Sequence, residues 1–211
     1  MKVQKALCLS IAAASTVVLA TATPASAGDS GKSELEGPIT FSAVSGDTAA
    51  WVWTPYETTS YQAANAVTWW EERNDPCGWE VLTRHLNKKD DPDGKRLLLD
   101  GTCQKTGRDD EKTIARPSLE AITSIEVCTN GKDTGKRKIK GLRIWGRTVS
   151  AGKVSDAEAG PAEITRANCS SWAAKKVSCP QGQVAVGLKI YHEGDAATGI
   201  ALVCRKVVSK K

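Results

Sequence analysis

Seven tryptophans are the residues of this sequence best suited to contacting a ligand. Only three tyrosines and one phenylalanine accompany them. An indole has a flat apolar face that can stack on a sugar ring, although the same face also fills protein cores. Trp69 and Trp70 are adjacent, so on a strand one side chain would point inward and the other outward. We therefore predict Trp69, Trp70, Trp79 and Trp145 as ligand-binding candidates.

Residues for acid–base chemistry are harder to find. Glycoside hydrolysis needs two carboxyl groups about 5–9 Å apart, and the neighbours Glu71 and Glu72 would face opposite ways on a strand. His85 is expected at an exposed strand position and His192 in a solvated turn. Neither histidine belongs to a recognisable Ser-His-Asp set. The sequence thus shows no evident catalytic site, and a glycan-active enzyme is the least favoured function class.

One aspartate-rich segment has the right atoms for a cation. Asp90, Asp91 and Asp93 precede Gly94 and could offer carboxylate oxygens to Ca²⁺, which takes 6–8 oxygen ligands. Pro92 interrupts the run and no glutamate follows at loop spacing, so a turn is the simpler interpretation. Zinc is disfavoured because the sequence has no C-x-x-C and no paired histidines. We expect no cofactor.

The first 27 residues have the three parts of a secretory signal peptide. Lys2 and Lys5 supply the positive start, Leu7–Ala20 is apolar, and Ala25-Ser26-Ala27 is a small-x-small cleavage site. The apolar run, about 14 residues, is shorter than the roughly 20 that cross a bilayer. We predict cleavage after Ala27, no membrane insertion, and a secreted, extracellular protein. The end of the signal is typical of high-GC Gram-positive bacteria.

Charge and cysteine content describe the mature chain further. Without residues 1–27, lysine plus arginine falls from 29 to 27 against 24 acids, a net charge of +3 that demands no nucleic acid. The basic clusters at 136–140 and 210–211 are expected to be a solvated turn and a tail. Cys8 leaves with the signal, and the even number that remains predicts disulfides in an exported chain. The six remaining cysteines are Cys77, Cys103, Cys128, Cys169, Cys179 and Cys204. They allow 15 sets of disulfide pairs, and their spacing does not select one of these sets.

Apolar alternation predicts a single all-β domain over residues 39–211, preceded by a flexible leader at 28–38. Strands are expected at 39–44, 122–127 and 139–149, and a hairpin joins those at 184–190 and 200–204. Residues 57–75 fit either a short helix or a loop plus strand, and this choice stays open.

Two internal similarities indicate a degenerate repeat of about three copies, with chance as the alternative. Residues 141–145 and 187–191 share the pattern Gly-Leu-basic-Ile-aromatic. The segments between Cys77 and Cys103 and between Cys179 and Cys204 are also nearly equal in length.

Residues 179–204 resemble one repeat of the vitelline membrane outer layer protein family. They have a Cys-Pro-x-Gly opening, a strand, an Asp-x-Ala turn at Asp195, and a closing strand that ends in Cys204. Residues 77–103 match in cysteine spacing and turn chemistry, residues 122–150 match in strand pattern, and the family's Trp-Gly opening is missing. The resemblance implies a secreted β-prism of three sheets around a pseudo-threefold axis, associated with carbohydrate binding or glycosyl transfer. It also implies the pairs Cys77–Cys103 and Cys179–Cys204, which leaves Cys128–Cys169, and it gives Asp195 a turn or ligand role.

Together these features predict a secreted carbohydrate-binding or cell-surface interaction protein. Its partner would be a glycan or an extracellular protein, and the sequence does not indicate an oligomeric state. The alternative is an extracellular structural or enzyme-inhibitor protein, with residues 88–94 as the inhibitory loop.

Overall fold

The computed structural model describes residues 31–48, 51–53, 56, 59–72, 75–88, 94–99, 109–130, 137–166, 168–172, 175–194 and 196–211. The regular structure in these ranges is entirely β, which confirms the predicted class. No helix in them could cross a membrane. The strands are β1 (Lys32–Phe41), β2 (Ser45–Gly46), β3 (Trp51–Trp53), β4 (Gln62–Glu72), β5 (Asp75–His85), β6 (Arg96–Leu99), β7 (Asp109–Ala115), β8 (Glu120–Thr129), β9 (Ile139–Ser150), β10 (Lys153–Val154), β11 (Ala159–Thr165), β12 (Val177–Ser178), β13 (Gln183–Glu193) and β14 (Ala196–Lys210).

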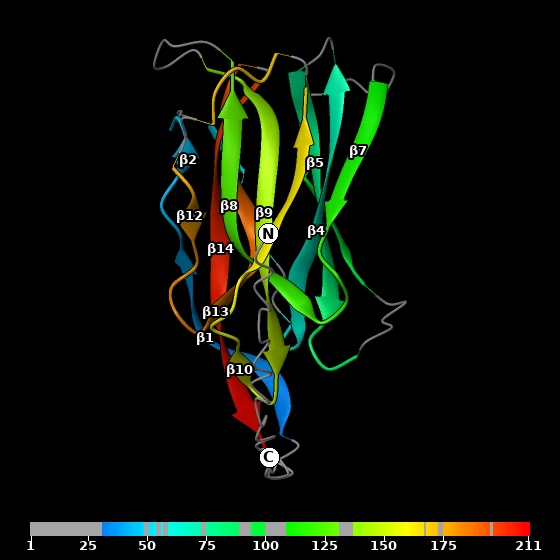
Figure 1. Cartoon of the computed structure of the whole chain (residues 1–211), viewed down its shortest axis with the longest axis vertical. Coiled ribbons are helices and arrows are strands. Elements are labelled where there is room, and N and C mark those ends of the chain that lie inside the picture. Colours follow the sequence, from blue (N-terminus) through cyan, green and yellow to red (C-terminus); the bar gives the residue numbers. More distant parts are fainter. Residues whose placement is uncertain are drawn as a thin grey trace, which may run out of the picture.

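These strands form three antiparallel sheets, each built on one long hairpin. The β4 sheet has the order β6-β5-β4-β7, and the β8 sheet has the order β10-β9-β8-β12 with β11 on β9. The β13 sheet has the order β1-β14-β13-β3 with β2 on β14. The long strands run along the long axis of the molecule (Figure 1). The three sheets enclose a shared core, which is the arrangement of a β-prism.

The three hairpins share one pattern of register. Each first strand carries an extra residue that interrupts the pairing: Asn65 in β4, Thr123 in β8 and Val186 in β13. A second register shift follows five positions later in each strand. A bulge increases the local twist and redirects side chains, so Asn65, Thr123 and Val186 occupy equivalent places in the three sheets.

A glycine marks the matching point on each second strand. Gly78, Gly141 and Gly199 each pair with the residue just before the second register shift. Each glycine opens a Gly-apolar-x-apolar run whose apolar residues are fully buried: Trp79 and Val81, Leu142 and Ile144, Ile200 and Leu202.

The similarity between residues 141–145 and 187–191 does not follow this shared pattern of register. Residues 141–145 lie on β9, the second strand of its hairpin, whereas residues 187–191 lie on β13, a first strand. The two segments therefore occupy non-equivalent places, because the sequence match compared strands of opposite direction.

The main core draws on all three sheets. Trp69 of β4 and Trp79 of β5 meet edge to face, with ring centroids 5.5 Å apart and an interplanar angle of 84°. Ile125 of β8 and Leu188 of β13 belong to the same buried cluster. Because every sheet turns one face toward this cluster, removal of apolar surface from water holds the prism together.

The strands predicted at 122–127, 139–149, 184–190 and 200–204 are confirmed. The flexible leader predicted for residues 28–38 is wrong from residue 32 onward. There β1 pairs with β14, from Lys32 opposite Lys210 to Phe41 opposite Val203. Residues 62–72, where a helix stayed possible, form β4.

Two disulfides have both partners within the described residues. They join Cys128 to Cys169, with 5.7 Å between Cα atoms, and Cys179 to Cys204, with 5.8 Å. Both are pairs that the family resemblance implied. Cys77 is also disulfide-bonded, and its expected partner Cys103 lies outside the described residues, as do the signal peptide and its cleavage site.

Residues of two hairpins meet where β5 and β9 begin, at one end of the prism. Asp75, at the start of β5, binds Lys138 Nζ through Oδ2 at 2.6 Å and Lys140 Nζ through Oδ1. Burial acts to raise the pKa of Asp75, but the hydrogen bonds from the two lysines outweigh it and lower that pKa. Lys140 is therefore a buried link between two sheets, not part of the solvated turn predicted for residues 136–140.

Candidate functional site

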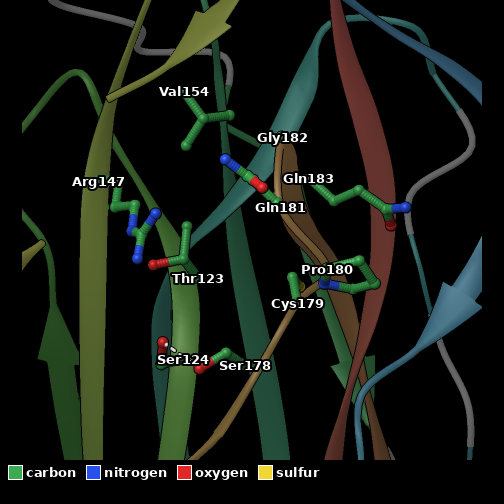
Figure 2. A pocket seen from close by; sticks show the side chains of 10 residues that line it. All are labelled: Thr123, Ser124, Arg147, Val154, Ser178, Cys179, Pro180, Gln181, Gly182 and Gln183. Carbon is green, nitrogen blue, oxygen red and sulfur yellow. Dashed lines mark hydrogen bonds between the residues drawn. The ribbon is translucent and has the colours of Figure 1, made fainter. Parts of the chain in front are cut away.

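A cavity of about 340 Å³ opens where the β8 sheet meets the start of β13. Its volume falls in the usual range for small-molecule sites, roughly 300–1,000 Å³. Figure 2 shows side chains from β8, β9 and the β12–β13 connection surrounding it. We call it the side cavity. The residues that line it are Thr123, Ser124, Arg147, Val154, Ser178, Cys179, Pro180, Gln181, Gly182 and Gln183.

The bulge in β8 shapes one wall of the side cavity. Thr123 is the extra residue of that bulge, and its carbonyl oxygen accepts a hydrogen bond of 2.9 Å from the Cys179 backbone N–H. The equivalent places in the other two sheets are filled. Asn65 Nδ2 donates to the carbonyl oxygens of residues 116, 117 and 120, and Val186 packs in an apolar cluster. Of the three equivalent bulges, the one in β8 thus borders a cavity of ligand size.

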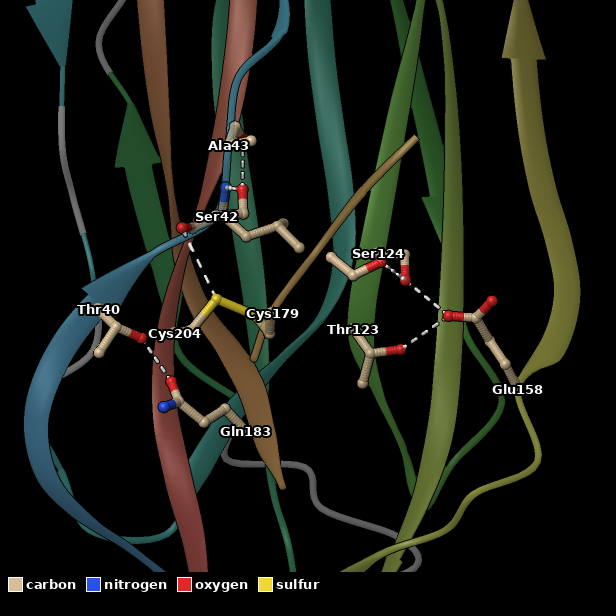
Figure 3. Close-up of a disulfide and its surroundings, with 11 residues drawn as sticks. Thr40, Ser42, Ala43, Thr123, Ser124, Glu158, Cys179, Gln183 and Cys204 are labelled. Carbon is tan, nitrogen blue, oxygen red and sulfur yellow. Dashed lines mark hydrogen bonds between the residues drawn. A yellow bond between two sulfur atoms is a disulfide. The ribbon is translucent and has the colours of Figure 1, made fainter. Parts of the chain in front are cut away.

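A chain of hydroxyl groups leads from the side cavity to a carboxylate. Ser124 Oγ donates to Glu158 Oε1 at 2.6 Å, and the Ser124 and Ser178 hydroxyl oxygens are 2.9 Å apart. Thr123 Oγ1 approaches the same carboxylate oxygen at 3.5 Å (Figure 3). Because a hydroxyl has one hydrogen, Ser178 donates to Ser124 and its own oxygen keeps room to accept from a ligand.

Glu158 stays charged at neutral pH although it is partly buried. Burial acts to raise its pKa, but hydrogen bonds from Lys176 and Ser124 and the charges of Lys176 and Arg147 lower it overall. Lys176 Nζ binds Oε2, so both carboxylate oxygens already have partners. This makes Glu158 a support for the wall of the cavity.

Arg147 reaches the side cavity from β9. Its Nε lies 4.0 Å from Glu158 Oε1, too far for a hydrogen bond. Within the described part of the chain, this buried Nε has no hydrogen-bond acceptor. A guanidinium remains charged at any physiological pH. The cavity is therefore lined by a cationic side chain that is 30% exposed and is paired with Glu158 by charge without a hydrogen bond.

The β12–β13 connection forms the opposite wall. Its tight turn is closed by the Gln183 N–H, which donates to the Pro180 carbonyl at 3.0 Å, and Gly182 has a φ of 74° that favours glycine. The disulfide between Cys179 and Cys204 fixes this connection to β14 (Figure 3). Thr40 Oγ1 also donates to Gln183 Oε1 at 2.5 Å. Figure 2 shows Gln181 and Arg147 on opposite sides of the cavity.

Trp145 is the tryptophan candidate that the structure places beside the side cavity. It pairs directly with Ser124 on the outer side of the β8 sheet and is partly exposed. Lys176 Nζ lies 4.5 Å from the centroid of its ring. Arg147, Ser124 and Ser178 were not identified as site residues from the sequence. One signal for Arg147 was present, because positions 143, 145 and 147 alternate and therefore place two arginines on the same strand face as Trp145.

The other predicted ligand-binding residues are not brought to this site. Trp69 and Trp79 have no exposed surface, and Trp70 is 9% exposed. They are wrong as ligand candidates because their rings fill the interior and cannot stack on a sugar. Asp195 and the calcium candidates Asp90, Asp91 and Asp93 lie outside the described residues, as does most of the inhibitory loop expected at 88–94.

Among the side chains that the structure describes, Glu71 and His192 do not form a catalytic pair. Glu71 is 1% exposed, accepts a hydrogen bond from Trp69 Nε1 at 2.9 Å, and pairs with Arg166. His192 is 4% exposed rather than solvated, since β13 extends through it. The described residues contain no cluster of three or more metal-ligating side chains.

A second hollow of about 270 Å³ lies at the hairpin-turn end, lined by Lys138, Glu193, Ala196 and Thr198. Two of its lining residues, Glu193 and Ala196, are close in sequence to Asp195. The side cavity offers more polar groups from described residues, so we treat it as the main candidate site.

Comparison with known proteins shows the fold. No family model matches the sequence, and no curated protein gives a significant match. The Calsepa lectin in complex with a biantennary N-glycan has a TM-score of 0.50 at 12% identity, over 81% of this chain and 99% of that one. The Calystegia sepium agglutinin has a TM-score of 0.48 at 13% identity, over 81% and 98% of the two chains. For a mannose-specific jacalin-related lectin from Morus nigra in complex with mannose, the values are 0.40, 13%, 87% and 99%.

Proposed function

We propose that this protein is a secreted glycan-binding protein and that the side cavity is its recognition site. The observation that carries the proposal is a polar cavity of about 340 Å³ beside a partly exposed indole. Sugars present many hydroxyl groups and an apolar ring face, and sites for them combine oriented polar groups with an aromatic surface. The Calsepa lectin, one solved protein with a similar fold, was determined in complex with a biantennary N-glycan.

The walls of the cavity suit the two sides of a sugar ring. Ser178 can accept a hydrogen bond from a sugar hydroxyl and pass the polarisation on through Ser124 to Glu158. Gln181 supplies both a donor and an acceptor. Trp145 lies beside Ser124 and offers apolar surface next to these groups.

The segment that resembles the vitelline membrane outer layer protein family forms part of this site. Its Cys-Pro-x-Gly opening, residues 179–182, is the wall opposite Arg147. We therefore propose a distant relationship to that family. The disulfides agree with export by the predicted signal peptide to the exterior of a bacterial cell.

The proposal is tested by binding the protein to a glycan array and to insoluble chitin, cellulose and peptidoglycan. Ser178→Leu places an apolar side chain in the cavity at an exposed position and is expected to reduce binding at least tenfold. Thr165→Leu, an exposed residue of β11 that does not line the cavity, is the matched control and should bind as the wild type does. The proposal would be overturned if the folded wild-type protein bound none of these glycans. It would also be overturned if Ser178→Leu bound them as tightly as Thr165→Leu does.

A further inference from the structure

The side cavity has a single ionisable group in its described lining. Of the residues that form it, Arg147 is charged, whereas the others are hydroxyl, amide, apolar or disulfide-bonded. The nearby carboxylate of Glu158 is an ion-pair partner of Arg147 but not a hydrogen-bond partner, because its Oε1 lies 4.0 Å from Arg147 Nε. A ligand in this cavity therefore meets one positive charge whose counterion is not hydrogen-bonded to it.

The exposed part of the Arg147 side chain is what a ligand in the cavity can contact. Its Nε is buried and lacks an acceptor among the described residues, whereas 30% of the side-chain surface is exposed. An acceptor on the ligand is therefore expected to bind the accessible N–H groups of the guanidinium. A planar guanidinium matches a carboxylate with two parallel N–H···O bonds.

We infer that the side cavity selects a sugar that carries one carboxylate, a uronic acid residue, and that Arg147 binds this carboxylate. The inference rests on the glycan-binding function proposed above and names its ligand class. One guanidinium balances the single charge of a carboxylate, whereas a phosphate monoester carries about −1.5 to −2 at pH 7. No second cation lines the described cavity to balance that larger charge.

The hydroxyl groups of the same sugar have partners on the other walls. Ser178 accepts from one hydroxyl through its free lone pairs. Gln181, which faces Arg147 across the cavity in Figure 2, bonds to another. The carboxylate and the hydroxyls of one pyranose ring are thus read from opposite sides.

The experiment compares glucuronate, galacturonate, glucose, galactose, glucose 6-sulfate and glucose 6-phosphate by isothermal titration calorimetry. At least one uronate is expected to bind the wild type about tenfold more tightly than its neutral counterpart, since a charge-assisted hydrogen bond is gained. Arg147→Gln should abolish this difference, and Arg147→Lys should retain part of it because the charge stays but the fork is lost. Arg143→Gln is the control. Arg143 lies on the same strand, two positions before Trp145, but it does not line the side cavity and packs instead on the Trp172 ring, 3.8 Å from its centroid.

The possible outcomes distinguish a failure of the carboxylate site from a failure of the proposed glycan-binding function. Equal binding of uronates and neutral sugars, unchanged in Arg147→Gln, would overturn the carboxylate site but leave glycan binding intact. Tighter binding of the sulfate or phosphate ester than of either uronate would overturn the choice of carboxylate. Binding of no sugar and no glycan by folded protein would remove the proposed function as well. Near-ultraviolet circular dichroism of each variant establishes that it is folded.

Discussion

Ser124 and Glu158 are joined by a 2.6 Å hydrogen bond that connects β8 to the loop between β10 and β11. Lys176, just before β12, binds the other carboxylate oxygen. One carboxylate therefore ties together three segments at the rim of the side cavity. Its role is to hold the rim in place while Arg147 stays available to a ligand.

Replacement of this carboxylate should loosen the rim and remove a pH dependence. Glu158→Gln is expected to destabilise the protein by about 1 kcal/mol at pH 7, because the amide has one acceptor oxygen for the two donors Ser124 and Lys176 and no negative charge for Lys176, which is partly exposed. A lowered folded-state pKa stabilises the protein above the ordinary value of 4.5 and this contribution is lost as the pH falls through the folded-state value. Urea unfolding at pH 7 and pH 3 should therefore show a smaller acid loss in Glu158→Gln than in the wild type. Glu163→Gln, at an exposed position, is the control, and an equal acid loss in Glu158→Gln and wild type would contradict this account.

His192 should make the protein less stable in mild acid. Burial lowers its pKa below the ordinary 6.5, and within the described residues its Nδ1 has no hydrogen-bond partner. The unfolded chain binds a proton more readily than the folded one, so stability falls as the pH drops below about 6.5 and levels off below the folded-state pKa. Thermal melts between pH 8 and pH 5 should show this loss in wild type and in His85→Gln, and a flatter profile in His192→Gln. A flat wild-type profile would show that the buried ring does not resist protonation.

The strands that could be predicted are those with one buried face and a polar alternation, such as 184–190. Strand β4 could not, because its segment from Ala63 to Thr68 is at most 2% exposed on both sides and its small residues also suit a helix. Strand β1 is mostly polar and is held by backbone pairing to β14 and by the buried Leu35. Composition does not reveal such pairing, which is why residues 32–38 resemble a loose leader in sequence.

The shared pattern of the three hairpins and the lining of the side cavity both depend on the register of strand pairing. The Gly-apolar-x-apolar runs at 78–81, 141–144 and 199–202 are visible in the sequence, but only their pairing shows that they are equivalent. The side cavity combines residues near 123, 147 and 178–183 through a bulge. The bulge at Thr123 is one extra residue in a strand and leaves no signature in composition. The sequence therefore indicated Trp145 from its residue type, but it did not indicate that Arg147 lines a cavity.

The repeated glycine of β14 should tolerate no side chain. A Cβ at Gly199 would lie 2.3 Å from the Asp47 carbonyl oxygen, in a backbone that cannot yield without moving β2. Gly199→Ala is expected to cost about 1–3 kcal/mol, as overpacked sites do. Gly160→Ala, where a Cβ meets nothing within 4 Å, is the control. Chemical denaturation measures both, and equal midpoints for the two variants would refute the close approach.

Tryptophans in the core and at the site should respond differently to truncation. Trp79→Ala removes a fully buried ring and is expected to cost about 3–5 kcal/mol in unfolding free energy. Trp145→Ala should cost much less stability, because the ring is partly exposed, but should weaken glycan binding. Thermal melts and array binding of the two variants test both halves. A Trp145→Ala protein with unchanged glycan binding would exclude this indole from recognition.

The two described disulfides should contribute similarly to stability but differently to binding. Their sequence separations of 25 and 41 residues correspond to about 3–4 kcal/mol each in the chain-entropy model. Cys179 lines the side cavity, whereas Cys128 and Cys169 do not. The double variant Cys179→Ala/Cys204→Ala is therefore expected to lose stability and also sugar affinity, since the β12–β13 wall is no longer fixed to β14. Cys128→Ala/Cys169→Ala should lose comparable stability and keep the affinity of the folded fraction. Calorimetric unfolding and sugar titration at a temperature where both variants are folded distinguish the two effects, and equal losses of affinity would show that the bond at the cavity has no special role in shaping it.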